Sequence, residues 1–444
     1  MYKRLCYLFL IPVLLPAQTK SEFQQILERL DRVEQENRGL AAEVRALRQE
    51  LAAARSKEDT AIPAVPLDER VATAEHRIAE QAQTKVEASQ RMPVSLTGML
   101  LFNAFLNGRQ SGDDQDPLVA SLTRGAASGG ASLRQTVLGL KFEGPEIPGG
   151  GKVSGDVYMD FFSGSSSSLN HLLRLRVASI DVDWKNQSIL FGQDKPIIAP
   201  REPNSLAQVG FSPLTGAGNL WLWGPQVRFE QRFAFGGQTT FRGQVGVYET
   251  SEPNMNAPAE YVSTLSQSRP GLEGRFELSH GFGEGKKIEV APGFHISKTH
   301  VLGLSLPSKL FTLDWSVQPI SKIEFSGTYF NGENAAGVGG LRQGFTVINR
   351  YRAIPVGAWG GWAQLSWIAT QRLSFNTYAG QESDRASDLL SGGITRNRAY
   401  AANLIYRIGQ NVLAGLEASQ VRTTYLGSGN RLNNHYDLGL AYLF

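Results

Sequence analysis

The sequence ends in NHYDLGLAYLF, residues 434–444, and this stretch decides the fold. Every second residue is large and apolar or aromatic: Tyr436, Leu438, Leu440, Tyr442 and Phe444. Side chains of a β-strand point alternately to its two faces, so a period of two predicts a strand with one apolar face. The run reaches the final residue, Phe444, without losing its phase.

The same alternation fills the part of the chain that follows residue 93. The segment 151–162 places Val157 and Phe161 on one face and Asp156 and Asp160 on the other. Two architectures fit this pattern. A soluble β-sandwich buries the apolar face, whereas a transmembrane barrel turns it to lipid and lines an aqueous lumen with the polar face.

The number of such segments favours the barrel, because bacterial barrels have an even number of strands. We predict sixteen strands, near residues 94–106, 132–143, 151–162, 172–184, 188–193, 225–235, 238–249, 270–280, 286–297, 309–318, 321–331, 357–369, 371–381, 396–408, 411–424 and 434–444.

The connections alternate between tight and long, as the periplasmic turns and external loops of outer-membrane barrels do. The long ones are expected at 107–131, 163–171, 194–224, 250–269, 298–308, 332–356, 382–395 and 425–433. Trp359 and Trp367 share one face of a strand at the positions expected of two interfacial aromatic girdles. The predicted fold is therefore an all-β transmembrane barrel of about 16 antiparallel strands spanning 93–444.

The N-terminus predicts export. Lys3 and Arg4 precede a short apolar run that ends at Pro16-Ala17, as in a signal peptide covering residues 1–17. The run is too short for a membrane helix. The single cysteine, Cys6, lies within it, and the near balance of 44 basic and 41 acidic residues gives no argument for nucleic-acid binding.

Residues 18–55 predict an α-helical coiled coil in the periplasm, because apolar residues repeat every seven positions from Phe23 to Ala54. A core asparagine, Asn37, is familiar in dimers, whereas the Arg29–Glu34 pattern favours trimers. The expected trimerisation residues are Arg29, Leu30, Val33, Glu34, Asn37, Leu40, Val44, Leu47 and Leu51. A linker and helical spacer follow at 56–92, interrupted by Pro63 and Pro66.

The long connection 194–224 is expected to fold inward and narrow the pore, because its apolar residues need cover. The alternative for this loop is an external cap or subunit latch. The strand 172–184 changes phase near Ala178-Ser179, which predicts a bulge there. The charged residues expected at the lumen and its constriction are Lys195, Arg201, Glu202, Arg174, Arg176, Arg228, Glu230, Arg232, Arg242, Arg275, Asp156 and Asp160. If the arginines converge on one wall, the pore prefers anions; if they pair with the acids, they neutralise one another.

The layout resembles the trimeric bacterial porins, and most closely the DcaP-like family. The resemblance is carried by the heptads of 23–55, by LRQTVLGLKFEGP at 133–145, by ILFGQDK at 189–195 and by the last strand. It implies a homotrimer in the outer membrane, in contact with lipid and lipopolysaccharide, that admits small hydrophilic solutes, often carboxylates. The last strand also resembles the signal that such barrels present to the barrel-assembly machinery, carried here by Tyr436, Leu438, Leu440, Tyr442 and Phe444.

No catalytic, metal-binding or cofactor motif stands out, so we expect neither an enzyme nor a cofactor. The six histidines show no ligand spacing, and GFGEG at 281–285 fits a hairpin turn better than a phosphate loop. The competing hypothesis is a structural one: an outer-membrane anchor or adhesin whose coiled coil spaces the membrane from the cell wall.

Overall fold

The computed structural model describes residues 94–164, 171–249, 270–283, 285–301 and 303–444. The chain divides into two compact units, Met1–Ala88 and Ser89–Phe444, and the described residues belong to the second. The predicted signal peptide, the coiled coil with its trimerisation residues, and the spacer lie outside the described residues. Within the described ranges, no helix has the length and apolar character needed to cross a bilayer.

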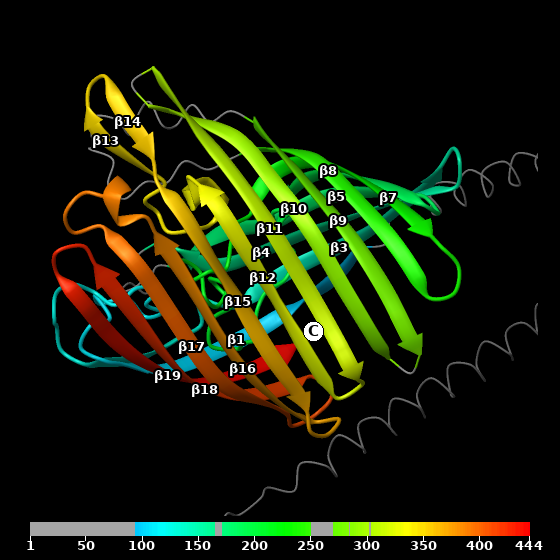
Figure 1. The fold of residues 1–444 in the computed structure, drawn as a ribbon. Coiled ribbons are helices and arrows are strands. Elements are labelled where there is room, and N and C mark those ends of the chain that lie inside the picture. Colours follow the sequence, from blue (N-terminus) through cyan, green and yellow to red (C-terminus); the bar gives the residue numbers. More distant parts are fainter. Residues whose placement is uncertain (1–93, 165–170, 250–269, 284, 302) are drawn as a thin grey trace, which may run out of the picture. The chain divides into compact units, whose positions relative to one another are not determined.

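The described unit is built of antiparallel strands (Figure 1). They are β1 (Val94–Asn107), β2 (Ser128–Ser132), β3 (Val137–Ile147), β4 (Gly151–Ser163), β5 (Leu172–Asp183), β6 (Gln187–Asp194), β7 (Gly224–Ala234), β8 (Thr239–Glu249), β9 (Pro270–Gly283), β10 (Lys286–Val301), β11 (Leu304–Ile320), β12 (Ile323–Glu333), β13 (Phe345–Asn349), β14 (Arg352–Pro355), β15 (Gly357–Ile368), β16 (Leu373–Asp384), β17 (Ile394–Arg407), β18 (Val412–Tyr425) and β19 (Gly429–Leu443). Two short 3₁₀ helices, η2 (Ala335–Val338) and η3 (Ala386–Asp388), lie in the connections.

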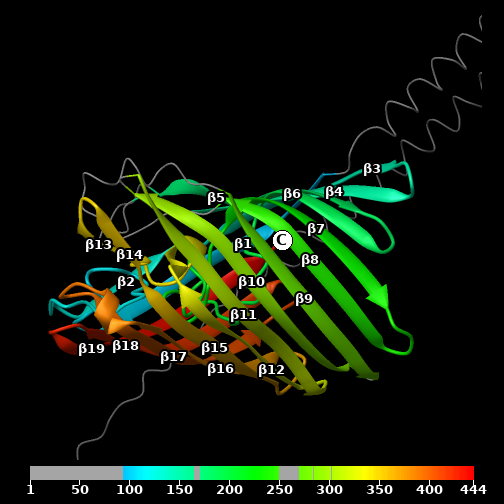
Figure 2. The ribbon, with the colours of Figure 1, turned by 45° about the horizontal axis from the view of Figure 1, so that its top comes forward.

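The strands close into a barrel of sixteen, which confirms the predicted number. β2 and β3 pair with successive parts of β1 and act as one strand interrupted at 133–136, while the β13–β14 hairpin forms a separate two-stranded sheet. Neighbouring strands pair in sequence order, and β1 completes the ring by pairing with β19 (Figure 1). The strands run obliquely around the barrel (Figure 2), as closure of a sheet requires.

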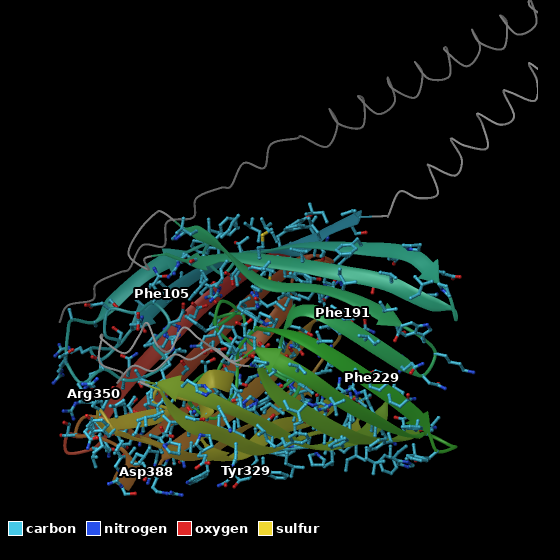
Figure 3. All side chains as sticks on the ribbon, turned by 90° about the horizontal axis from the view of Figure 1, so that it is seen from above. Phe105, Phe191, Phe229, Tyr329, Arg350 and Asp388 are labelled. Carbon is cyan, nitrogen blue, oxygen red and sulfur yellow. The ribbon has the colours of Figure 1, made fainter. Side chains whose placement is uncertain are left out.

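The two faces of the wall have the opposite arrangement to that of a soluble protein. On β19, Tyr436 and Leu438 are 53% and 47% exposed, whereas the polar His435 and Asp437 are 2% and 5% exposed. Large apolar side chains cover the outer face of the other strands as well, including Phe191, Phe229 and Tyr329 (Figure 3). Such a surface is stable only in contact with hydrocarbon, so the barrel is a transmembrane one.

The aromatic residue Phe444 lies at the closing seam between β1 and β19. The backbone N–H of Gly98 on β1 donates to the carbonyl of Phe444 at 3.0 Å, and the N–H of Phe444 donates to the carbonyl of Gly98 at 3.2 Å. Gly98 has a φ of 157°, and a Cβ there would lie 2.9 Å from the Phe444 ring. The phenyl ring of the terminal residue therefore covers a glycine of the first strand at the junction.

The bulge predicted at Ala178-Ser179 lies two residues earlier. The pairing of β4 with β5 passes from Tyr158–Val177 to Met159–Leu175, which leaves Arg176 as the extra residue. The guanidinium groups of Arg174 and Arg176 consequently both reach Asp160. The sequence pattern located the bulge only to within two residues, because a bulge at either position returns the later apolar side chains to the outward face.

Two connections predicted to be long are tight turns. β10 and β11 extend to residues 301 and 304, and β18 and β19 extend to 425 and 429, so neither 298–308 nor 425–433 is a long loop. The strand expected at 132–143 likewise starts at 128 and continues to 147. Backbone pairing continues beyond the lipid-facing band, where the outward side chains no longer need to be apolar.

Candidate functional site: the lumen of the barrel

The segment 195–223, between β6 and β7, contacts inward-facing side chains around the barrel. Its first turn is fixed by Glu273 of β9, whose carboxylate accepts a 2.8 Å hydrogen bond from the backbone N–H of Ile197. Glu273 is fully buried and also contacts Nδ1 of His295 at 3.0 Å. Ile198 packs with Tyr248 and Phe330 in a buried cluster. The apolar residues of this segment thus obtain their cover from the inner wall.

Arg201 continues the segment toward a group of acids on β9, β10 and β11. Its Nη2 lies 2.5 Å from Glu289 and 3.8 Å from Glu277, and its Nε lies 3.2 Å from Asp314. Glu202 pairs with Lys195 within the same segment. The two mid-loop charges expected at the constriction are therefore in ion pairs.

The middle of the segment reaches the opposite wall. The Ser205 hydroxyl donates to Glu417 of β18 at 2.6 Å, and the Asn103 amide of β1 donates to the carbonyl of Leu206 at 2.8 Å. Leu206 lies directly over Gly439, where a Cβ would come within 3.0 Å of the Leu206 Cβ. The absence of a side chain at Gly439 lets the loop lie against the wall.

The remainder of the segment passes the interruption between β2 and β3. The side-chain oxygen of Gln135 accepts the N–H groups of Val209 and Gly210 at 2.5 and 2.7 Å, and Arg174 donates to the carbonyl of Gly210. Farther on, the carbonyl of Gly216 accepts a 2.9 Å bond from Asn397 of β17. Because its partners come from both sides of the ring of strands, the segment 195–223 crosses the lumen.

Three arginines converge on one wall of this lumen. Arg174 and Arg176 share the fully buried carboxylate of Asp160, at 2.6 and 3.6 Å. Arg134 joins them, with its guanidinium carbon 4.3 Å from the ring centre of Phe162. Around these residues the rings of Phe162, Phe211 and Trp223 lie within 5.4 Å of the Arg174 guanidinium carbon. The cluster of Arg134, Arg174 and Arg176, called the arginine cluster below, carries more positive charge than Asp160 offsets.

The other predicted arginines, on β7, β8 and β9, are paired with acids of β5–β11. The pairs are Arg228–Asp194 at 3.4 Å, Arg232–Asp183 at 2.5 Å, Arg232–Glu230 at 3.2 Å, Arg242–Glu277 at 2.7 Å, Arg275–Glu277 at 2.6 Å and Arg275–Asp314 at 2.7 Å. Asp156 lies opposite Lys141 in the pairing of β3 with β4. The two alternatives considered for the lumen charges thus apply to different arginines: Arg174 and Arg176 of β5 converge, whereas the arginines of β7–β9 are neutralised by acids.

A cavity of about 400 Å³ lies beside the arginine cluster, between the segments 108–127, 195–223 and 334–344. Its lining includes Asp114, Asp116, Arg134, Phe211 and Arg342. Burial raises the pKa of the Asp116 carboxyl to about 7; Arg134 opposes this shift, and Asp114 and Glu417 reinforce it. The charge of this cavity therefore changes near neutral pH.

Sequence reasoning missed Arg134, Asp116 and the anchoring residues Gln135 and Glu417. Arg134 and Gln135 fall within the strand expected at 132–143, which the structure interrupts at 133–136, so this part of the prediction was wrong and strand alternation did not single them out. Glu417 alternates correctly on β18, but nothing in the sequence indicates that a loop from a distant strand bonds to it. Among the described residues, no group of three or more His, Cys, Asp or Glu side chains could hold a metal ion.

The barrel is similar to known outer-membrane proteins. It matches the outer membrane channel DcaP of Acinetobacter baumannii with a TM-score of 0.65 and 16% identity, over 80% of this chain and 97% of that chain. It matches OmpF of Salmonella typhi, solved with daunomycin, with a TM-score of 0.51 and 12% identity, over 80% of this chain and 99% of that chain. No model of a protein family and no curated protein sequence matches the chain. The chain therefore has the fold of the outer-membrane channels, and its resemblance to the DcaP-like porins is confirmed at the level of the fold.

Proposed function

We propose that the protein is an outer-membrane porin, a water-filled channel for passive diffusion of small hydrophilic solutes. The single observation that carries this proposal is the wall of sixteen strands with apolar residues outside and buried polar residues inside. Barrels of this size enclose an aqueous channel rather than a packed core. The segment 195–223 crosses that channel and is its proposed constriction.

The arginine cluster supports a preference for anions such as carboxylates. Positive side chains that line a pore favour anions, and the acids of the β6–β11 wall are already paired with arginines. Arg174 is 24% exposed at its side chain, so it is accessible to a passing solute. In this proposal, Lys195, Arg201 and Glu202 shape the constriction chiefly because their ion pairs hold the segment 195–223 in place.

The test is conductance of the purified protein in planar bilayers. We expect stable, open channels and, under a salt gradient, a reversal potential whose sign corresponds to anion preference. A barrel that conducts no ions supports the alternative function, an anchor or adhesin. Open channels that prefer cations would support the porin function but contradict the proposed preference for anions.

The proposed assembly is a homotrimer held by the coiled coil at 18–55, which extends into the periplasm. The proposal includes no enzymatic step and no cofactor. Deletion of 18–55 is expected to leave a folded barrel and to weaken the trimer, as measured by mass of the detergent-solubilised protein. Unchanged trimer mass would assign assembly to the barrel walls alone.

A further inference from the structure

The cavity beside the arginine cluster carries charged side chains of both signs. It has a volume of about 400 Å³, and its lining includes Arg134 from the interruption between β2 and β3 and Asp114 and Asp116 from the segment 108–127. Within the part of the chain that the structure describes, neither Arg134 nor Asp116 forms an ion pair. The two charges therefore face one cavity without neutralising each other in direct contact.

Arg134 is a buried cation with no carboxylate in contact. The residue is 4% exposed, its Nη2 donates to the carbonyl of Phe162 at 2.8 Å, and its Nε has no hydrogen-bond partner among the described residues. The neighbouring carboxylate of Asp160 is already shared by Arg174 and Arg176. Because a buried charge is costly unless it is paired, the wall of the cavity favours an anionic group of a ligand at Arg134.

The acids of the cavity belong to a loop whose backbone is held on both sides of Asp116. The Asn107 side chain donates to the carbonyl of Asp114 at 3.0 Å, and the Asn397 side chain donates to the carbonyl of Leu118 at 2.9 Å. Among the residues described by the structure, none donates a hydrogen bond to the Asp116 carboxylate. This carboxylate is therefore fixed in position and available to a cationic group.

Apolar side chains complete the lining of the cavity. Leu118 and Val119 come from the same loop as the acids, Leu341 comes from the segment 334–344, and Phe211 comes from the segment 195–223. The ring of Phe211 packs edge-on against that of Phe162, with centroids 4.9 Å apart. A ligand that matches the whole lining has an anionic group, a cationic group and an apolar body.

We propose that this cavity binds zwitterionic solutes of the kind represented by short apolar peptides, with the carboxylate at Arg134 and the ammonium group at Asp116. Both contacts would be charge-assisted hydrogen bonds, which are the stronger kind. A simple carboxylate leaves Asp116 without a partner, and a simple cation leaves Arg134 without one. The site rests on the proposed porin function, because solutes would reach it through the pore, but its binding is measured without conduction.

Binding should depend on pH in opposite directions for zwitterions and for simple anions. Burial raises the pKa of the Asp116 carboxyl to about 7, so the group gains negative charge as the pH rises through that value. The charged groups around it are Arg134, which opposes the shift, Asp114 and Glu417, which reinforce it, and Arg342 and Asp437. From about pH 6 to about pH 7.5 an α-amino group stays largely protonated, so a zwitterion should bind more tightly and a simple anion more weakly.

The experiment is isothermal titration calorimetry of the full-length protein in detergent at about pH 7.5, where the ammonium group of the ligand is still present. The ligands are alanyl-phenylalanine, its N-acetyl derivative, which lacks the ammonium group, and its C-terminal amide, which lacks the carboxylate. We expect the dipeptide to bind about tenfold or more tightly than either derivative, since each derivative leaves one charge of the cavity unpaired.

Two variants test the two ends of the site separately. R134Q should weaken binding of the dipeptide and of its N-acetyl derivative but not that of the amide. D116N should weaken binding of the dipeptide and of the amide but not that of the N-acetyl derivative. The matched controls are R124Q and D113N, which remove exposed charges from the segment 108–127 and should bind the dipeptide as the wild type does. Folding of every variant is checked by heat-modifiable migration in gels.

Binding of the N-acetyl derivative as tightly as the dipeptide would overturn the proposal and leave a cavity for simple anions. Equal effects of R134Q and R124Q, or of D116N and D113N, would also overturn it. If R134Q does not fold, the comparison of D116N with D113N still decides the question at the other charge. Bilayer conductance is measured separately: open channels without dipeptide binding reject this site and keep the porin function, whereas dipeptide binding to a silent barrel supports the site and rejects the porin.

Discussion

The guanidinium group of Arg174 donates two hydrogen bonds to the carboxylate of Asp160, of 3.1 and 2.6 Å. Asp160 also accepts the backbone N–H of Phe162 at 3.0 Å and lies 3.6 Å from Arg176. One fully buried acid is thus shared by two arginines, with Arg134 nearby. Arg134 lines the cavity beside the cluster. Removal of the charges of Arg174 and Arg176 is the most direct test of selectivity.

We predict that R174Q/R176Q lowers the anion-to-cation permeability ratio by about threefold or more, because the local positive potential that attracts anions is lost. Reversal potentials under a salt gradient measure this ratio. The control is R232Q, on the neutralised wall, which removes a charge already paired with Asp183. An equal change in R232Q and the double variant would mean that net charge alone, rather than the arginine cluster, sets the preference.

The loop that crosses the lumen depends on Glu273. We predict that E273A leaves the Ile197 N–H without its partner and loosens the first turn of the segment, at a cost of about 1 to 3 kcal/mol. The expected result is a noisier single-channel current, because the loosened segment adopts more than one position in the lumen. E146A removes an exposed carboxylate near the β3–β4 turn and should leave the current unchanged.

Unaltered current in E273A would mean that the other contacts hold the loop without Glu273. Those contacts include the bonds that Ser205 and Gly210 make to Glu417 and Arg174. In that case E273A combined with E417A should show the loosened state.

The sequence predicted the wall far better than the interior. Lipid contact imposes a period of two on every strand. Outward-facing positions such as Leu438 and Leu440 can therefore be recognised from the strand's own sequence, without knowledge of its neighbours. The ends of strands are harder to predict from the sequence. Thr299 and His300 of β10 still pair with β11, but they lie beyond the apolar band, where lipid imposes no alternation. Strand existence could therefore be read from the sequence, and loop length could not.

The interior follows from contacts between residues far apart in the chain. Asn103 and Leu206 are separated by 103 residues, and Ser205 and Glu417 by 212. Periodicity indicates that Asn103 and Glu417 face inward but says nothing about which loop meets them. The sequence therefore predicted Arg174, Arg176 and Asp160 as lumen residues but could not distinguish this cluster from the paired arginines of β7–β9.

The cavity beside the arginine cluster should respond to pH through Asp116. Its pKa is raised to about 7 by burial, so the carboxyl is largely neutral below that pH and negative above it. Since the negative form offsets nearby arginine charge, anion preference should fall as the pH rises through 7. Reversal potentials recorded at about pH 5 and about pH 9 measure the change.

The variant D116N should abolish most of this dependence and keep the low-pH preference at both values. D113N removes an exposed carboxylate from the same loop and should preserve the dependence. A pH response that persists in D116N would assign the titration to another group.

The seam between Gly98 and Phe444 predicts a specific assembly defect. We expect F444A to reduce the yield of folded barrel several-fold, because the ring that covers Gly98 at the closing seam is lost. G98V should have a similar effect, since its Cβ would lie 2.3 Å from the carbonyl oxygen of Val137 and its φ of 157° disfavours a branched side chain. Heat-modifiable migration of the membrane fraction measures the folded yield.

The matched control is F235A, which removes an equally large aromatic that is 67% exposed near the β7–β8 turn, away from the seam. If F235A and F444A reduce the yield equally, the loss reflects membrane-facing apolar area in general, and the closing seam has no special part in assembly.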